Sequence, residues 1–307
     1  MSYQGHGPFG GKSVSEIRIG DRVARSSYGL DIVFVVINII TDRIRAEKVL
    51  LRGLNRRLIA DAPTDDLIPV NKEGIELSSE IFHREVRNSV EKIFRRRIAE
   101  DLSMDYSRYS NMILPPGVDY RHIPGRVLHL DGDADYLKNC LKYYKEMNVP
   151  AVGYYVPEEV QPRKVVGLFK EHLPDILVIT GHDGFIARIN DRLSLDSYRT
   201  SKYFVETVKK ARQAEPDKDS LVIIAGACQS YYEALIDAGA NFASSPKRIF
   251  IHCADPLFVA EKISYTPFNL VAQVTQVAEN IISGLDGIGG IETRGKLRLS
   301  LPNTLLN

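Results

Sequence analysis

The chain has 307 residues, 44% of them hydrophobic, which is enough for two domains with a sizeable core. Its 40 Lys and Arg residues nearly balance 39 Asp and Glu residues, so the formal net charge of +1 gives no sign of a nucleic-acid or anionic-membrane binder. The most hydrophobic run, 32–40, is too short to span a membrane, and the first residues lack the apolar core of a secretory signal. These features predict a soluble protein that stays in a cytoplasm.

Cysteine usage agrees with a reducing compartment. The three cysteines, Cys140, Cys228 and Cys253, are too few for a disulfide framework, and their spacing matches no zinc motif. We therefore expect free thiols and neither a metal nor a cofactor.

The first part of the chain has the pattern of a small β-barrel. After a flexible N-terminus at 1–16, β-rich runs separated by turn residues occupy 31–40, 43–51 and 57–70. This pattern predicts an SH3-like barrel over residues 17–72. Such a barrel either binds a peptide, polymer or neighbouring domain, or serves only for docking and folding.

A helix and a linker are expected over residues 73–125. Ser78 or Ser79 offers an N-cap, and apolar residues then recur at helical spacing. These apolar positions are Phe82, Val86, Val90, Phe94 and Ile98. The opposite helix face is strongly basic, and we interpret it as solvated rather than as a nucleic-acid contact. From 101 to 126 the periodicity is lost, as is typical of a linker.

Residues 126–307 alternate between strand and helix patterns. Short buried strands are predicted at 126–130, 151–156, 175–180, 221–225, 241–244 and 249–252. Helices are predicted at 134–147, 164–172, 202–214, 231–238 and 255–263. This alternation predicts an α/β domain in which a parallel sheet is covered by helices on both faces.

Two of these strands end in reactive side chains. His182 follows the run that begins at Asp175, and Cys228 follows the run that begins at Leu221. The carboxyl ends of parallel strands meet at one edge of a sheet, where α/β proteins place their chemistry. A thiol with an imidazole beside it forms a nucleophile and its general base. We expect both groups at a solvent-facing sheet edge.

The surrounding residues fit this chemistry. A helix that starts near Ser230 or Tyr231 would favour the thiolate form of Cys228. The backbone N–H of Cys228 and one from the Asp183–Gly184 turn could form an oxyanion hole. Cys140, on the apolar face of a helix, and Cys253, beside His252, fit structural roles better.

Several segments, in order, resemble the YabG family of sporulation-specific cysteine proteases. They are 128–133 (LHLDGD), 174–183 (PDILVITGHD), 225–230 (AGACQS), 239–246 (GANFASSP) and 289–295 (GGIETRG). The resemblance covers most of residues 17–300. It implies an endopeptidase made in the mother cell of a spore former, which processes spore coat and related proteins.

A more distant similarity is to caspase-like proteases, including the clostripain and gingipain groups. They also place a His after one buried strand and Ala-Cys after the next, usually with Gly directly after the His, where this chain has Asp183 before Gly184. In their Arg- or Lys-specific members an acidic residue ends the first strand, a position that Asp131 or Asp133 fills here. The similarity implies cleavage after Arg or Lys. Ser244 and Ser245 are candidates for the strand that pairs with the substrate.

Two alternatives remain open at this stage. The chain could be a non-catalytic scaffold for coat assembly, or a thiol amidohydrolase that uses the same two residues. For a protease selective for Arg, Arg108 in the predicted linker is the expected first site of self-cleavage, because mobile backbone is cut before helical segments such as 95–97. The sequence does not determine the oligomeric state.

Overall fold

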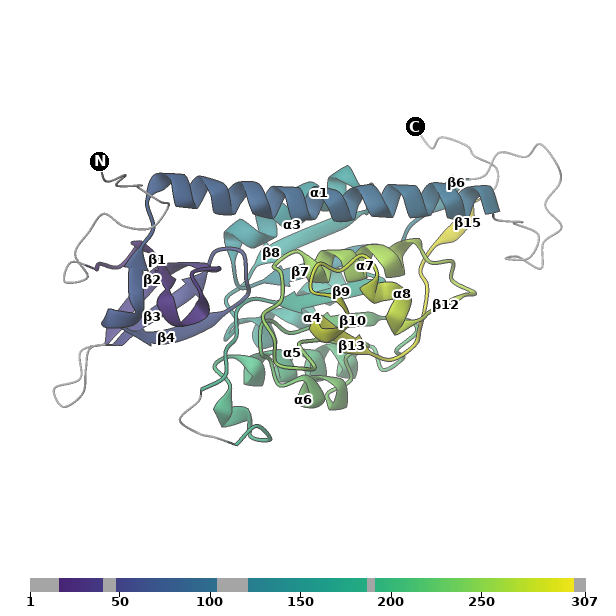
Figure 1. Ribbon diagram of the computed structural model, residues 1–307. Coiled ribbons are helices and arrows are strands. Elements are labelled where there is room, and N and C mark those ends of the chain that lie inside the picture. Colours follow the sequence, from purple (N-terminus) through teal and green to yellow (C-terminus); the bar gives the residue numbers. More distant parts are fainter. Residues whose placement is uncertain (1–16, 41–47, 104–120, 187–190, 301–307) are drawn as a thin grey trace.

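The computed structural model describes residues 17–40, 48–103, 121–186 and 191–300. Two sheets lie side by side in these residues, and the long helix α1 (Lys72–Ser103) runs along both (Figure 1). The N-terminus at 1–16 and Arg108 fall outside the described residues, so the predictions made for them stay predictions.

The N-terminal sheet has five antiparallel strands in the order β4-β3-β2-β1-β5. Their bounds are β1 (Arg22–Arg25), β2 (Val33–Ile40), β3 (Lys48–Gly53), β4 (Ile59–Pro63) and β5 (Leu67–Pro69). Every second residue of β3 is buried, as expected for a strand with one face on a core. The structure therefore shows an antiparallel sheet where the sequence predicted a small barrel.

Helix α1 starts six residues before the predicted cap at Ser78. Asn71 Oδ1 accepts a hydrogen bond from the N–H of Gly74 at 2.9 Å, which caps the first turn. At about 1.5 Å of rise per residue, the 32 residues are long enough to bridge the two sheets. Phe94 and Ile98, expected to be buried, are exposed, and Ile93 takes the buried position.

Part of the basic face of α1 is paired rather than solvated. Arg96 and Arg97 both donate to the buried carboxylate of Glu261, on helix α7 (Asp255–Tyr265), at 2.7–2.9 Å. These bonds fix α1 against the second sheet.

The second sheet has six strands in the order β13-β11-β10-β9-β7-β8. Its strands are β7 (Val127–Asp131), β8 (Ala151–Tyr155), β9 (Ile176–Thr180), β10 (Val222–Ala225), β11 (Phe242–Ser244) and β13 (Ile288–Gly290). All neighbouring pairs are parallel except β11 and β13. The predicted α/β class and parallel sheet are confirmed, and the antiparallel edge strand was not predicted.

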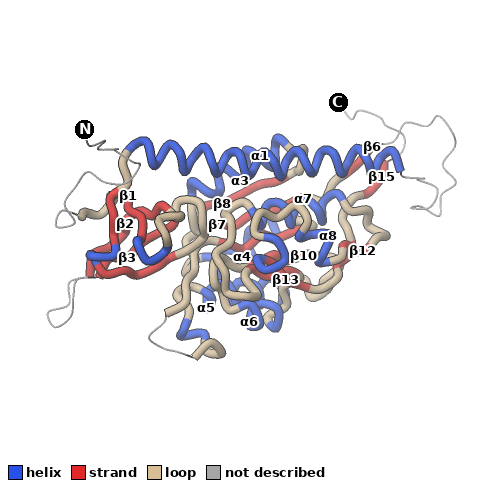
Figure 2. Tube along the Cα trace, viewed as in Figure 1, coloured by secondary structure: helices blue, strands red, loops and turns tan. Residues whose placement is uncertain are grey.

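Helices cover both faces of this sheet (Figure 2). Alternate residues of β9 face opposite ways: Ile176 and Val178 pack with α1, α7 and α3 (Ala134–Glu146), whereas Leu177 and Ile179 pack on the other face. That second face is covered by α4 (Gln161–His172), α5 (Ser201–Ala214) and α6 (Tyr232–Asp237). Burial on both faces explains the unbroken apolar runs.

Smaller elements complete the described chain. The short helices are α8 (Val274–Ala278) and α9 (Gly284–Gly287), with 3-10 turns at Ser26–Tyr28, Thr64–Asp66 and Leu195–Ser197. Two short antiparallel pairs join β12 (Val271–Ala272) to β14 (Thr293–Arg294) and β6 (Arg121–Ile123) to β15 (Arg298–Ser300). The predicted strand at 249–252 is not formed; His252 makes a single bridge to Arg56 instead.

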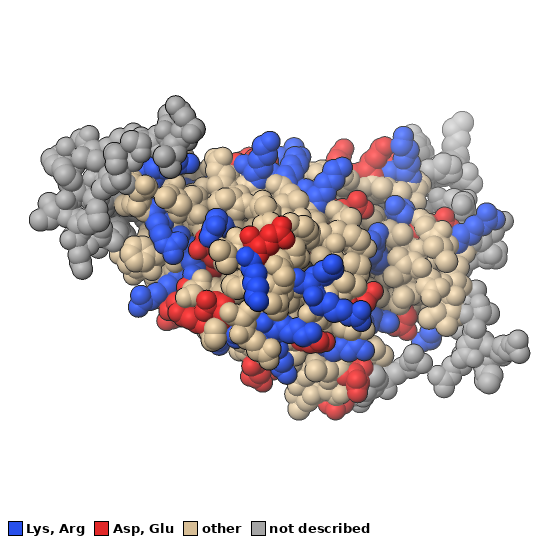
Figure 3. All heavy atoms as spheres, turned by 180° about the vertical axis from the view of Figure 1, so that it is seen from behind, with Lys and Arg blue, Asp and Glu red and all other residues tan. Residues whose placement is uncertain are grey.

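No helix within the described residues is long and apolar enough to cross a membrane. Lys and Arg side chains are interspersed with Asp and Glu side chains on the face shown in Figure 3.

Candidate active site

The ends of β7, β9 and β10 lie side by side at one edge of the six-stranded sheet. Asp131 is the last residue of β7, His182 lies two residues beyond β9, and Cys228 lies three residues beyond β10. The parallel register aligns Asp131 with Thr180 and Ile179 with Ala225. The topology therefore brings Asp131, His182 and Cys228 to the same edge of the sheet.

A carbonyl oxygen from the N-terminal sheet sits between the two residues expected to form the oxyanion hole. Arg57 lies in the loop 54–58 that joins β3 to β4. Its carbonyl oxygen accepts from the N–H of Cys228 and from the N–H of Asp183, each at 3.1 Å. Two backbone donors that converge on one oxygen can stabilise a developing negative charge.

The side chain of Arg57 is fully buried at the same sheet edge. Its guanidinium donates to both oxygens of Asp131, at 3.0 and 2.9 Å, and to the carbonyl oxygen of Cys253 at 3.0 and 2.8 Å. Burial is the largest single influence and would raise the pKa of Asp131, but Arg57 and His129 together outweigh it and the pKa is lowered. This is the bidentate geometry by which a carboxylate recognises Arg.

Asp133 has a different role. Its Oδ1 accepts from the N–H groups of Asp135 and Tyr136 and so caps helix α3. Its Oδ2 accepts from Arg52 at 2.8 Å and lies 3.6 Å from Nε2 of His182. Of the two acidic residues proposed from the sequence, Asp131 contacts the buried Arg.

His182 is held by several neighbours. Its N–H donates to Oε1 of Glu158 at 2.7 Å, and its ring lies against the ring of Tyr136, with centroids 5.2 Å apart. Its Nε2 atom is buried and has no hydrogen-bond partner among the described residues. A buried ring nitrogen without a hydrogen-bond partner, close to charged side chains, is a candidate for proton transfer.

The thiol of Cys228 is bound to backbone. The N–H of Ile251 donates to Sγ at 3.1 Å, and Sγ donates to the carbonyl oxygen of Ile251 at 3.5 Å. The side chain packs in the apolar cluster under the N-terminal sheet, with Leu51 and Leu58 among its members. Burial raises the pKa of Cys228 to about 12.

Two expectations for this site are wrong for the described arrangement. Cys228 is 0% and His182 is 2% exposed, because the N-terminal sheet covers the edge that was expected to face solvent. Helix α6 begins only at Tyr232 and has six residues, and the thiol pKa is raised rather than lowered. Burial outweighs any effect of the helix.

Asp183 directly follows His182 and is buried. Its buried carboxylate accepts from the N–H groups of Gly184 and Thr200 and from the hydroxyls of Ser201 and Ser230. Ser230 Oγ in turn accepts from the N–H of Ala227, next to Cys228. The carboxylate therefore ties the His182 turn to the Cys228 turn and fixes the spacing of the two backbone donors.

Glycine is needed at Gly184 for close approach. A Cβ there would lie 2.1 Å from the carbonyl oxygen of Ile59, in the strand that follows the Arg57 loop. Only Gly admits the incoming backbone at this distance.

Ser244 and Ser245 lie at the end of β11 and just after it. Ser245 Oγ donates to the carbonyl oxygen of Ile249 and accepts from the N–H of Gln229. The segment paired with the Arg57 loop is instead 252–253: Arg56 bridges His252 in antiparallel fashion, and the N–H of Cys253 donates to the carbonyl oxygen of Asn55 at 3.3 Å. A role of the two serines beside the substrate stays a prediction.

Sequence reasoning missed Arg57, Glu158 and Tyr136. Tyr136 OH donates to the carbonyl oxygens of Gly53 and Arg56, at 2.5 and 3.0 Å, and so holds both ends of the loop. The signal for Arg57 was weak, because a single Arg between two β-rich runs is ordinary in a turn. The described residues contain no group of three His, Cys, Asp or Glu side chains able to hold a metal ion.

Comparison with known proteins identifies the class as a peptidase. The profile of the family described as YabG peptidase U57 matches residues 18–302, so the chain belongs to that family. A relative named sporulation-specific protease YabG, from Bacillus subtilis (strain 168), is 42% identical over 287 residues, which are 94% of this chain and 98% of the relative. The resemblance inferred from the sequence motifs is confirmed.

Proposed function

We propose that the chain is a cysteine endopeptidase in which Cys228 is the nucleophile and His182 the general base. The observation that carries this proposal is the position of the Arg57 carbonyl oxygen, 3.1 Å from the N–H groups of both Cys228 and Asp183. These donors come from the residue that bears the nucleophile and the residue after the base. A peptide carbonyl bound there is polarised next to the thiol.

The reaction follows from these groups. His182 takes the thiol proton as Cys228 Sγ attacks the carbonyl carbon, and the two N–H groups stabilise the oxyanion. His182 then gives the proton to the leaving amine, which leaves a thioester on Cys228. Water, deprotonated by His182, hydrolyses the thioester and restores the thiol. Asp133 and Glu158, 3.6 and 3.8 Å from the ring nitrogens, stabilise the imidazolium that forms in between.

Selectivity for Arg is proposed to come from Asp131. The carboxylate is fully buried and binds the guanidinium of Arg57, and the carbonyl oxygen of Cys253 supplies a second acceptor for a guanidinium. Lys would keep the charge but lose the paired hydrogen bonds, so it is expected to be the poorer substrate.

In the cell, we propose that the protein acts during sporulation, as the name of its relative indicates for that protein. Its substrates would be spore coat and related proteins, and its location the cytoplasm of the mother cell at the forming coat. A scaffold without catalysis would have no use for two backbone donors aimed at one carbonyl oxygen, so the protease is favoured over that alternative.

Mass spectrometry of a peptide library incubated with wild type and with Cys228→Ala tests this function. We expect cleavage after Arg in preference to Lys, and none with Cys228→Ala. Equal products from both proteins would rule out Cys228, and cleavage after Leu as fast as after Arg would rule out Asp131. Release of ammonia from small amides without cleavage of peptides would favour an amidohydrolase.

A further inference from the structure

The Arg57 loop is a narrow turn fastened at both ends. The N–H of Leu58 donates to the carbonyl oxygen of Arg56 at 2.8 Å, so Arg57 is at the apex. The N–H of Gly53 donates to the carbonyl oxygen of Leu58 at 2.9 Å, which closes the loop at its base. The turn therefore presents one residue, Arg57, to the edge of the second sheet.

The chain on each side of Arg57 is also paired with the site. Before it, Arg56 forms an antiparallel bridge with His252. After it, Leu58 forms a parallel bridge with Asp183, and the N–H of Ile59 donates to the carbonyl oxygen of Asp183 at 2.9 Å. The Arg57 side chain, its carbonyl oxygen and the backbone on both sides of it all contact the site. A peptide substrate binds a protease through the same groups.

An arginine that only stabilised the contact between the sheets would need its charge neutralised, which Asp131 does. It would not need its carbonyl oxygen on the N–H groups of Cys228 and Asp183. The combination is explained by recognition of the Arg57–Leu58 peptide bond.

We propose that the 54–58 loop is the first substrate of this protein's own site: Arg57 fills the pocket of Asp131 and excludes other substrates until the Arg57–Leu58 bond is cut. This inference rests on the proposed cysteine-protease function. It places a self-cleavage site within the described residues, ahead of Arg108 in the chain.

The cut is a complete peptide hydrolysis. Cys228 Sγ bonds to the carbonyl carbon of Arg57, the C–N bond to Leu58 breaks, and His182 passes the thiol proton to the nitrogen of Leu58. One water then cleaves the thioester, which leaves a carboxylate on Arg57 and restores the thiol. The break separates β3 from β4 covalently and frees the turn, so Arg57 can leave the pocket.

The geometry makes this first cut slow. Sγ is engaged with the backbone of Ile251, and the N–H of the bond to be cut is used inside the turn. Both bonds must break before attack and departure of the amine. We therefore expect a single slow event followed by faster turnover of other substrates.

N-terminal sequencing of full-length proteins aged after purification tests the site. Wild type should release a fragment that begins at Leu58, and Cys228→Ala should not. Arg57→Gln should lose that fragment, whereas Arg56→Gln, a change of the same kind one residue away, should keep it. The Arg56 side chain donates to the carbonyl oxygen of Asn55 at 3.4 Å and lines a pocket against α1, which makes it a matched control.

A fluorogenic Arg peptide separates this inference from the proposed function. Wild type should show a lag that ends as the Leu58 fragment appears, and Arg57→Gln should cut the peptide without a lag. If Arg57→Gln fails to fold, judged by circular dichroism, Arg57→Lys should lengthen the lag about tenfold, because it keeps the charge but not the paired bonds. If wild type cuts the peptide without a lag while the Arg57–Leu58 bond stays intact, this inference is overturned and the protease function stands. If wild type cuts neither the peptide nor the Arg57–Leu58 bond, both the inference and the protease function are overturned.

Discussion

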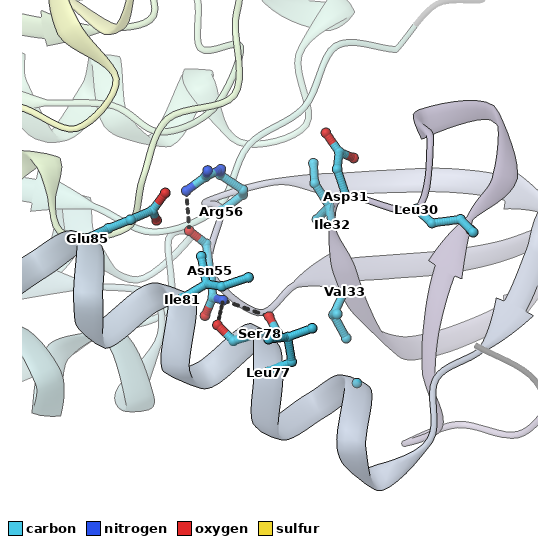
Figure 4. Close-up of a pocket in the computed structure, with 11 residues that line it drawn as sticks. Leu30, Asp31, Ile32, Val33, Asn55, Arg56, Leu77, Ser78, Ile81 and Glu85 are labelled. Atoms are coloured by element: carbon cyan, nitrogen blue, oxygen red, sulfur yellow. Dashed lines mark hydrogen bonds between the residues drawn. The ribbon is translucent and has the colours of Figure 1, made fainter. Parts of the chain in front are cut away.

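The neighbouring residues Arg56 and Arg57 of the 54–58 loop have different surroundings. Arg57 is fully buried against Asp131. Burial would lower the pKa of Arg57, but its neighbours, mainly the charge and hydrogen bonds of Asp131, together raise it. Arg56, together with Asn55, lines a pocket of about 310 Å³ between the loop and α1 (Figure 4). Asn55 donates to the carbonyl and hydroxyl oxygens of Ser78 there. The Arg57 side chain therefore contacts the candidate active site, whereas the Asn55 side chain fastens the loop to α1.

The largest effect is expected on catalytic activity, from removal of the two groups proposed to react, Cys228 and His182. Cys228→Ala and His182→Ala should each lower kcat/KM for an Arg peptide by about 10⁴-fold or more, since the two act as a unit. Initial rates of peptide cleavage, measured with equal concentrations of folded wild type and variant, give this ratio. Activity within tenfold of wild type in either variant would exclude that residue.

Removing the partner of Arg57 should destabilise the uncut chain. Asp131→Asn in a Cys228→Ala background leaves a buried guanidinium without its counter-charge, which typically costs about 3–5 kcal/mol in free energy of unfolding. Changing Arg57→Met in the same chain should restore most of that loss. Urea unfolding decides the matter: additive losses in the double change would show that the two side chains are not coupled.

The pH dependence of stability should carry the same signature. The pKa of Asp131 is lowered by folding, so its contribution is full at neutral pH and is lost as pH falls below its ordinary value of about 4. Between pH 5 and pH 3, Cys228→Ala should therefore lose more stability than the same chain with Asp131→Asn and Arg57→Met. If the free energy of unfolding of the two proteins changed equally with pH, the ion pair between Arg57 and Asp131 would be contradicted.

Thiol reactivity should report whether the loop is in place. Burial raises the pKa of both Cys228 and Cys140 to about 12, so both should react slowly with iodoacetamide at pH 8. Arg57→Gln should speed alkylation of Cys228 by about tenfold or more and leave Cys140, in the core under α1, unchanged. Peptide mapping by mass spectrometry compares the two; faster alkylation of both would indicate general loosening.

The smallest effect on stability is expected from a change at Arg56. Arg56→Gln should shift the free energy of unfolding by no more than about 0.5 kcal/mol, as usual for a partly exposed side chain, since Arg56 forms no ion pair within the part of the chain that the structure describes. Thermal melts at one pH measure it. A loss comparable to that of Asp131→Asn would remove the contrast between the two arginines.

The strand ends could be predicted from sequence because they depend on local pattern and on one topological rule. Apolar runs at 176–180 and 222–225 are buried on both faces, and parallel order then brings His182 and Cys228 to one edge. The start of α1 was predicted too late in the chain. Ser78 and Ser79 also have side chains that can cap a helix, but Asn71 precedes them and caps the first turn.

What covers the site could not be predicted. The contact between Arg57 and Asp131 joins residues 74 positions apart, and nothing in the local pattern of the 54–58 turn distinguishes Arg57 from Arg56. A low pKa was expected for Cys228 from the helix start nearby, but the N-terminal sheet buries the thiol and raises its pKa instead. Docking of one sheet on another depends on shape, which periodicity does not encode.

The most direct test of the account is binding of a peptide that ends in Arg to catalytically inactive protein, measured by calorimetry. The Cys228→Ala chain should not bind it, because Arg57 occupies the pocket, whereas Cys228→Ala with Arg57→Gln should bind it saturably and lose binding again on Asp131→Asn. Equal binding by the first two proteins would contradict the claim that Arg57 occupies the substrate site.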